Sequence, residues 1–344
     1  MPAVFRRLGY EVLTTMNLTA VLNLLADGGF HSGEALGDAL GVSRTAIWKH
    51  LQKLDELGLN LISVKGKGYC LEGGLELLDE RKILESVSDD VQARIDVLDI
   101  HSVIDSTNIK ALSRAAESDA SGYICLAEQQ TAGRGRRGRE WVSPFGKNIY
   151  LSALWGFDGG AAALEGLSLA VGVAIVRALQ KQGLSDLQLK WPNDVLWRGR
   201  KLAGVLLEMT GDVTGRCQVV VGVGLNVSMP ASAGSAIDQA WVDVDSIAED
   251  LNIPPLSRNH LVGHLLDELI PMLNDFQYGG FAALRADWEA LDAYRDQRVE
   301  LRMGANSASG VAKGVSDTGA LRVMTEDGET LYNGGEISLR GPVR

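Results

Sequence analysis

The residues best suited to chemistry lie in a glycine- and arginine-rich loop, residues 129–141, with the sequence QQTAGRGRRGREW. Gly133, Gly135 and Gly138 satisfy the pattern GxGxxG. In a dinucleotide-binding domain a helix follows this pattern, and its N-terminus holds the pyrophosphate. Here the loop is followed by Pro144 and by the strand-like segment NIYLSALW. The context therefore argues against a Rossmann-type site.

The same loop carries four arginines within six residues, although the formal net charge of the chain is -11. Glycines let backbone N–H groups approach phosphate, and guanidinium groups bind phosphate oxygens in a bidentate manner. We therefore predict that the loop binds a polyphosphate, is mobile when empty and becomes ordered on ligand binding. The alternative is a solvated or RNA-contacting basic patch. The four arginines are Arg134, Arg136, Arg137 and Arg139.

A second segment, KWPNDVLWRGRKLAGVLLE, is expected to converge on the loop. Pro192 ends the preceding strand, and the Asn-Asp pair after it favours a turn. We therefore place Lys190 and Lys201 on adjoining strands that flank a hairpin, close enough to bind one ligand. Gly204 would let that ligand approach the backbone of a strand.

The segment DSTN, residues 105–108, has two interpretations. Its hydroxyl and amide groups could bind a small polar head group. Equally, they could cap a helix over residues 109–116.

The N-terminal part of the chain has the order of a winged helix-turn-helix. Apolar residues have helical spacing over 18–25, a second short helix is expected over 33–40, and Ser43 can cap a third helix over 44–57. The segment LNLISVKGKGYCLEGG then alternates around a basic centre, as a hairpin does. The alternative is a small helical subdomain that binds protein or nothing.

Positive charge in this module lies where a recognition helix and a wing contact phosphates. Arg44 begins the third helix, Lys49 lies within it, and Lys65 and Lys67 occupy the wing tip. The acidic chain as a whole does not suit generic nucleic-acid binding, so the contact must be local. The predicted DNA-binding residues are Ser43, Arg44, Thr45, Trp48, Lys49, Gln52, Lys65 and Lys67.

The remainder predicts an α+β domain with a largely antiparallel sheet, followed from about residue 297 by a small β domain. The longest apolar stretch, residues 166–179, is interrupted by Ser168 and Arg177 and is too short for a membrane span, so we expect a buried helix. Three separated cysteines without CxxC spacing suit a reducing cytosol and no zinc site.

The sequence resembles the family of bifunctional biotin-protein ligases and biotin operon repressors over nearly all of the chain after Met16. The resemblance rests on HSGEALGDALGVSRTAIWKHLQKL, GKGY, DSTN, GRGRRGR, SPFGKNIYLS, KWPND, KLAG, GVGLNV and GGEISLR, in family order. It implies a multidomain α+β protein. The expected parts are an extension (1–16), a winged helix-turn-helix domain (17–76), a mixed, mostly antiparallel catalytic domain (77–296) and a C-terminal SH3-like β-barrel (297–344).

The resemblance also implies a two-step reaction. Biotin and MgATP would give biotinyl-5'-AMP and pyrophosphate, and the adenylate would then acylate a lysine of a biotin carboxyl carrier protein. Biotinyl-5'-AMP would act as corepressor, promoting a homodimer that binds operator DNA in the cytoplasm. The alternatives are a lipoate-protein ligase and a ligand-sensing transcription factor without ligase activity.

Particular positions match the family's functional residues, and no metal-binding residues are predicted. The catalytic candidates are Arg136, Lys190 and Lys201. The biotin-binding candidates are Ser106, Thr107, Asn108, Gln130, Arg134, Arg136, Lys201 and Gly204. The nucleotide-binding candidates are Gly133, Arg134, Arg136, Lys190, Asn226, Trp241 and Arg340.

Overall fold

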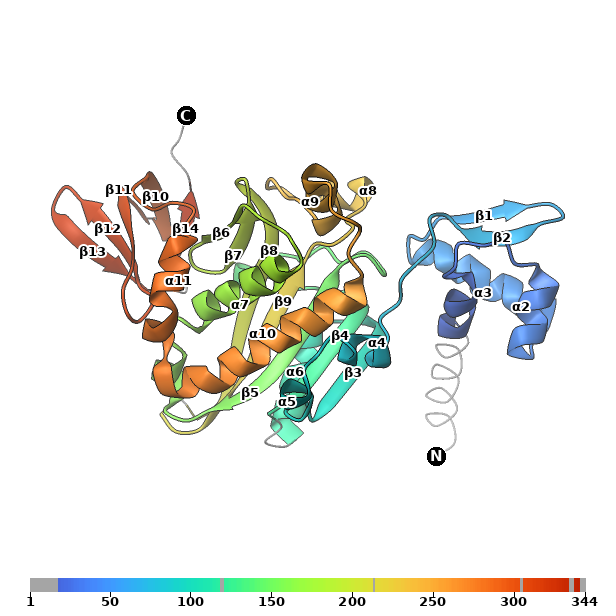
Figure 1. The fold of residues 1–344 in the computed structure, drawn as a ribbon, viewed down its shortest axis with the longest axis horizontal. Coiled ribbons are helices and arrows are strands. Elements are labelled where there is room, and N and C mark those ends of the chain that lie inside the picture. The colour runs from blue at the N-terminus through green and yellow to red at the C-terminus, as the bar shows by residue number, and fades with distance from the viewer. Residues whose placement is uncertain (1–17, 118–120, 213, 304–305, 334–336, 341–344) are drawn as a thin grey trace. The chain divides into compact units, whose positions relative to one another are not determined.

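The computed structural model describes residues 18–117, 121–212, 214–303, 306–333 and 337–340 (Figure 1). The predicted extension, residues 1–16, lies outside the described residues. The chain forms two compact units. The first ends at Leu78 and also includes Pro144–Gly146, and the second contains the rest of the chain from Asp79 onward.

The first unit is the winged helix-turn-helix that the sequence predicts. Residues 18–25 are helical and are followed by α2 (Gly33–Leu40), α3 (Arg44–Glu56) and a hairpin of β1 (Leu61–Val64) and β2 (Gly68–Leu71). The turn of the hairpin is exposed.

Helix α3 begins and packs for the reasons that its sequence suggests. The Ser43 hydroxyl caps it by accepting a hydrogen bond from Ala46 N at 3.2 Å. Ile47, Leu51 and Leu54 form the predicted apolar stripe and are buried. Each such side chain stabilises the unit by roughly 1.5–3 kcal/mol. The opposite face is left exposed to solvent.

The second unit is built on a seven-stranded sheet in the order β3-β4-β5-β9-β8-β7-β6 (Figure 1). Only the β3–β4 pair is parallel, so the sheet is mixed and mostly antiparallel, as predicted. The strands are β3 (Val97–Ile104), β4 (Tyr123–Gln130), β5 (Ile149–Phe157), β6 (Leu187–Lys190), β7 (Asp194–Trp197), β8 (Arg200–Gly211) and β9 (Cys217–Leu225).

The sequence analysis missed β7, and its placement of Lys190 and Lys201 on adjoining strands was wrong. Lys190 lies on β6 and Lys201 on β8, with β7 paired between them. The run Val195–Trp197 is too short to recognise as a strand, but all three side chains are buried and their backbone pairs on both sides.

Long helices cover the sheet. Helix α7 (Leu167–Lys181) packs against α10 (Arg258–Gly279) (Figure 1). Helix α7 contacts the strands β6, β7 and β8, and α10 contacts β5. The segment 160–181 is long and apolar enough to cross a membrane by composition, but 61% of its apolar 18-residue window is buried within the unit. The predicted buried helix is thus confirmed. The other helices of this unit are α4 (Glu80–Leu84), α5 (Asp89–Gln92), α6 (Thr107–Glu117), α8 (Ala231–Gly234), α9 (Val244–Leu251) and α11 (Arg285–Ala290).

The C-terminal part of the same unit is a five-stranded antiparallel sheet in the order β13-β12-β11-β10-β14. Trp191 Nε1, just after β6, donates to Gly319 O at 2.9 Å and so ties this sheet to the larger one. The strands are β10 (Arg298–Met303), β11 (Asn306–Val315), β12 (Leu321–Thr325), β13 (Gly328–Tyr332) and β14 (Ile337–Arg340).

Candidate active site

The second unit contains a cavity of about 430 Å³ on which most of the predicted ligand-binding residues converge. Its wall comes from the arginine-rich loop, the ends of β4 and β6, strands β7 to β9, and residues 236–241. The predicted residues that line it are Ser106, Thr107, Asn108, Gln130, Arg134, Arg136, Lys190, Lys201, Gly204, Asn226 and Trp241.

Two opposed glycines and a tryptophan form one wall of the pocket. Gly204 on β8 and Gly224 on β9 are direct partners in the sheet. A Cβ atom would lie 3.2 Å from the Trp141 ring at Gly204 and 2.4 Å from it at Gly224. The indole therefore lies directly on the strand backbone. Its buried Nε1 has no hydrogen-bond partner in the described structure.

Lys201 is held at one end of the pocket, together with Arg136 and Lys190, and we call this the cationic end. Its Nζ lies 2.8 Å from Asp194 Oδ1 and 5.4 Å from the centroid of the Trp141 ring. The backbone is also fixed, because Lys201 N donates to Ala240 O and Val242 N donates to Lys201 O, each at 2.9 Å. The Lys201 side chain is 16% exposed, so its ammonium group is positioned but accessible.

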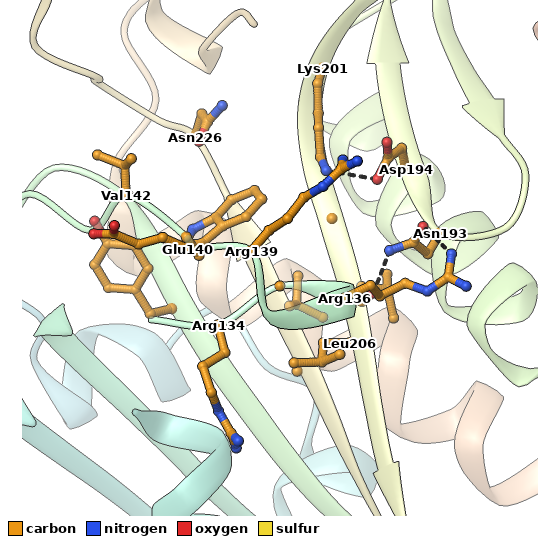
Figure 2. A pocket seen from close by; sticks show the side chains of 18 of the residues that line it. Arg134, Arg136, Arg139, Glu140, Val142, Asn193, Asp194, Lys201, Leu206 and Asn226 are labelled. Atoms are coloured by element: carbon orange, nitrogen blue, oxygen red, sulfur yellow. Dashed lines mark hydrogen bonds and ion pairs between the residues drawn. The ribbon is translucent and has the colours of Figure 1, made fainter. Parts of the chain in front are cut away.

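Arg136 reaches the same end from the loop. Its Nη1 donates to Asn193 Oδ1 at 3.2 Å, and Asn193 Nδ2 donates to Val205 O at 2.8 Å (Figure 2). Burial lowers the pKa of the Arg136 guanidinium, and the nearby Asp194 carboxylate opposes that change. The loop arginines Arg137 and Arg139 lower it further. An incoming anion would relieve this repulsion.

The opposite end presents hydroxyl and amide groups. Ser106, Thr107 and Asn108 lie at the start of α6 and are buried, so the DSTN segment both begins a helix and lines the pocket. Thr107 N donates to Gln130 Oε1 at 3.0 Å. Gln130 Nε2 in turn donates to Ser143 Oγ at 3.3 Å.

Arg134 does not point to the cationic end. Its side chain runs away from Lys201 and Asn193 (Figure 2), and its Nη2 donates to both carboxylate oxygens of Glu208, at 3.1 and 3.0 Å. Of the three loop arginines labelled in Figure 2, Arg136 and Arg139 have side chains that extend toward Asn193, Asp194 and Lys201.

The remaining predicted nucleotide-binding residues lie in different places. Asn226 Nδ2 donates to Val242 O at 3.1 Å, and Trp241 packs on Gly234 beside the Lys201 backbone. Gly133 does not line the pocket but packs closely on the loop, since a Cβ there would lie 2.5 Å from Trp141 O. Arg340 ends β14, and its side chain lies outside the described part of the chain.

Several pocket residues were not singled out from the sequence. Trp141, Asn193 and Asp194 line the cavity, and Glu208 supports Arg134 from β8. The Asn-Asp pair was interpreted only as a turn, although its position between two predicted ligand lysines was a usable signal. Nothing local in the sequence pairs Glu208 with Arg134, because the two residues are brought together by the fold.

The predicted DNA-binding residues of the first unit form a polar, exposed surface. Arg44, Thr45, Lys49 and Gln52 are exposed on α3, as are Lys65 and Lys67 at the turn of the wing. Trp48 on the same helix is 51% exposed, whereas Ser43 serves as the helix cap.

Comparison with known proteins agrees with this arrangement. The model of the biotin/lipoate A/B protein ligase family matches residues 101–226, an HTH domain model matches 17–70, and the biotin protein ligase C-terminal domain model matches 296–340. The chain is 41% identical to the bifunctional ligase/repressor BirA of Escherichia coli (strain K12), a match that covers 93% of this chain and 96% of that protein.

Two further similar proteins cover a smaller share of this chain. The biotin–[acetyl-CoA-carboxylase] ligase of Paracoccus denitrificans is 35% identical and covers 69% of this chain and 98% of itself. The biotin protein ligase from Aquifex aeolicus, solved in complex with biotin and ATP, has 27% identity and a TM-score of 0.60 over 72% of this chain and all of its own. The chain therefore belongs to the family of bifunctional biotin-protein ligases and repressors.

Proposed function

We propose that this protein activates biotin with ATP, transfers it to a lysine of a biotin carboxyl carrier protein, and represses transcription when it holds the activated intermediate. One observation carries the proposal. A single cavity has neutral hydrogen-bonding groups at one end and Arg136, Lys190 and Lys201 at the other. That distribution suits a molecule with a polar, uncharged head and a carboxylate that meets a polyphosphate.

Biotin fits this distribution residue by residue. Its ureido head would contact Ser106, Thr107, Asn108 and Gln130, which supply both donors and acceptors. Its apolar portion would lie against the Trp141 ring, which packs on the strand backbone at Gly204. Its carboxylate would then reach the Lys201 ammonium.

The first step needs charge neutralisation and alignment, not a protein nucleophile. A biotin carboxylate oxygen attacks the α-phosphorus of ATP, the bond to the β-phosphate oxygen breaks, and pyrophosphate leaves. Lys201, Lys190 and Arg136 would stabilise the charge that develops on the phosphate oxygens. Cys125 is unsuited to covalent catalysis because it is buried and burial raises its pKa to about 12.

The second step uses the mixed anhydride. The carrier lysine attacks the acyl carbon as a free amine, the acyl–phosphate bond breaks, AMP leaves and the amine loses a proton. Mg²⁺ would enter with ATP, because the described residues contain no group of three or more acidic, His or Cys side chains able to hold a metal. Its ligands would be phosphate oxygens with at most a nearby carboxylate such as Asp194.

The regulatory function would use the first unit. Arg44, Lys49, Lys65 and Lys67 would contact phosphates of operator DNA, while Thr45, Trp48 and Gln52 face the bases. Biotinyl-5'-AMP would promote a homodimer through the central sheet, so that two recognition helices meet two half-sites. The carrier protein would compete with homodimerisation for the same surface. Both processes would take place in the cytoplasm.

The test is incubation of the full chain with MgATP, biotin and a biotin carrier domain, followed by intact mass of the carrier. We expect a gain of one biotin that Arg136→Ala greatly reduces and that Arg81→Ala, an exposed arginine on α4, leaves unchanged. Lipoate runs in parallel, because the matched family also includes lipoate ligases. Lipoate incorporation without biotin incorporation, or no incorporation of either, would refute the proposal for the enzyme. Operator binding that does not respond to biotin and ATP would refute it for the repressor.

A further inference from the structure

Glu208 lies just outside the pocket and contacts two of its lining residues at once. The carboxylate accepts from Arg134 Nη2 at 3.0 and 3.1 Å and from Asn108 Nδ2 at 2.8 Å. We propose that Glu208 is a positioning residue that fixes the arginine-rich loop across the head-group end of the pocket, and that Arg134 is the anchor of this loop and does not bind phosphate. The identity of the ligand as biotin rests on the proposed function, whereas the contacts of Glu208 with Arg134 and Asn108 do not.

The carboxylate determines the orientation of the Asn108 amide. An ionised carboxylate can only accept hydrogen bonds, so the Asn108 NH₂ group must face Glu208 and its Oδ1 must face away. Ser152 Oγ lies 2.6 Å from that oxygen and 2.8 Å from Thr107 Oγ1. The Ser152 hydroxyl is the donor to both oxygens, and the Thr107 hydroxyl in turn donates to Gln130 Oε1 at 3.2 Å.

The same network reaches the far end of the loop. Thr107 N donates to Gln130 Oε1, Gln130 Nε2 donates to Ser143 Oγ, and Ser143 Oγ donates to Trp141 O at 2.8 Å. The loop is thus tied at Arg134 and again beyond Trp141 to one set of side chains. Those side chains are the ones proposed to bind the head group.

Strand β9 packs directly beneath the Asn108 amide, so this side chain has little room to move if Glu208 is lost. A Cβ at Gly222 would lie 2.3 Å from Asn108 Oδ1, so the amide rests directly on strand β9. Asn108 is 5% exposed, whereas Glu208 and Arg134 side chains are 25% and 41% exposed. The ion pair is therefore at the edge of the pocket, where loss of either partner would loosen the loop without emptying the interior.

This arrangement predicts that loss of the ion pair affects the binding of biotin and of ATP differently. Losing the anchor should weaken the binding of biotin, whose head group lies on the network, and spare ATP, whose phosphates lie near Lys201 and Arg136. If Arg134 were a phosphate ligand, its loss would instead raise the KM for ATP, and loss of Glu208 would free it to bind phosphate more tightly.

The test uses the full chain and the variants Glu208→Ala, Glu208→Gln, Arg134→Ala and the double alanine variant. We expect each alanine variant to raise the Kd for biotin about fivefold, the double variant to be no worse than the singles, and the KM for ATP to stay within about twofold. Glu208→Gln keeps an acceptor oxygen and should lose less than Glu208→Ala. Glu329→Ala, which removes the arginine–glutamate pair between Arg322 on β12 and Glu329 on β13, is the control and should leave both constants unchanged.

Hydrogen exchange of the loop amides in the ligand-free protein provides a readout that does not depend on biotin. Glu208→Ala should speed exchange at residues 131–139, and Glu208→Gln serves if the alanine variant fails to fold. Additive losses, a raised KM for ATP in Arg134→Ala alone, or unchanged exchange would each overturn the inference. Failure of the wild-type chain to bind biotin would refute the proposed function. The hydrogen-exchange result would then decide whether Glu208 anchors the loop.

Discussion

The wall formed by Gly204, Gly224 and Trp141 makes a graded prediction. Replacing Gly224 with alanine places a Cβ 2.4 Å from the indole, whereas the same change at Gly204, its partner across the sheet, places one at 3.2 Å. Ordinary contact begins near 3.4 Å. The ring must therefore move by roughly 1 Å in Gly224→Ala but only by a few tenths in Gly204→Ala.

The cost follows from what the ring supports. A displaced indole no longer lies under the Lys201 ammonium, a contact of roughly 0.5–2 kcal/mol, and overpacking of this kind adds roughly 1–3 kcal/mol. Part of this combined cost is relieved when the ring shifts into the pocket. We therefore expect Gly224→Ala to weaken biotin binding by about 2–3 kcal/mol, or about 30- to 150-fold. Gly204→Ala should lose about tenfold or less.

The assay is calorimetric titration of each variant with biotin, with circular dichroism to confirm that both remain folded. Pyrophosphate release at saturating biotin then reports the effect on the chemical step through Lys201. Equal losses in the two variants, or a larger loss in Gly204→Ala, would refute the argument that the ring lies on these strands as described. A loss in stability without a loss in affinity would do the same.

Three further predictions concern a buried carboxyl group, the DNA contacts of the wing and the ordering of the arginine-rich loop. Burial raises the pKa of Asp292 to about 6, so the folded chain holds a proton that the unfolded chain releases between about pH 4 and pH 6, and its stability falls as the pH rises through that range. Asp292→Asn should therefore stabilise the second unit by up to about 3 kcal/mol near pH 8 and by little near pH 4, as measured by urea unfolding. Alanine at both Lys65 and Lys67 should weaken binding to all DNA sequences alike and reduce the slope of log affinity against log salt by about 2 in fluorescence anisotropy, whereas an unchanged slope would exclude wing contacts to phosphate. Ligand should slow hydrogen exchange at residues 135–139, and equal protection with and without biotin and ATP would contradict ordering of the loop.

Much of the fold was predictable because local patterns and the final structure agree. The apolar stripe of α3 and its Ser43 cap, the alternation in the wing and the apolar run of α7 each specify one element with one buried face. The exception, β7, is only four residues long and contains no alternation, since Val195, Leu196 and Trp197 are all buried. Its presence depends on pairing with strands on both sides, which no local window contains.

The sequence motifs that form the site were predictable, but the residue pairs that interact within it were not. The spacing of the arginines and lysines indicated a polyphosphate-binding loop, and these residues do converge on one cavity. Which cation performs which task depends on long-range neighbours. Glu208 is 74 residues from Arg134 along the chain, and Trp241 reaches Lys201 through an isolated bridge. Sequence spacing therefore identifies the charged groups, and only the fold distinguishes an anchor from a ligand.

The division of the cations explains how an acidic protein can bind a polyphosphate. Arg134 is neutralised by Glu208 at the head-group end, and this pairing would leave the local charge there low for an uncharged ureido ring. At the other end Lys201 has Asp194 as its partner, while Arg136 lies near Arg137 and Arg139, which lower its pKa. Positive charge is thus concentrated where the triphosphate would lie, in a pocket where water screens it less than at the surface. The overall charge of -11 need not oppose binding, because local arrangement and not net charge sets the potential inside the cavity.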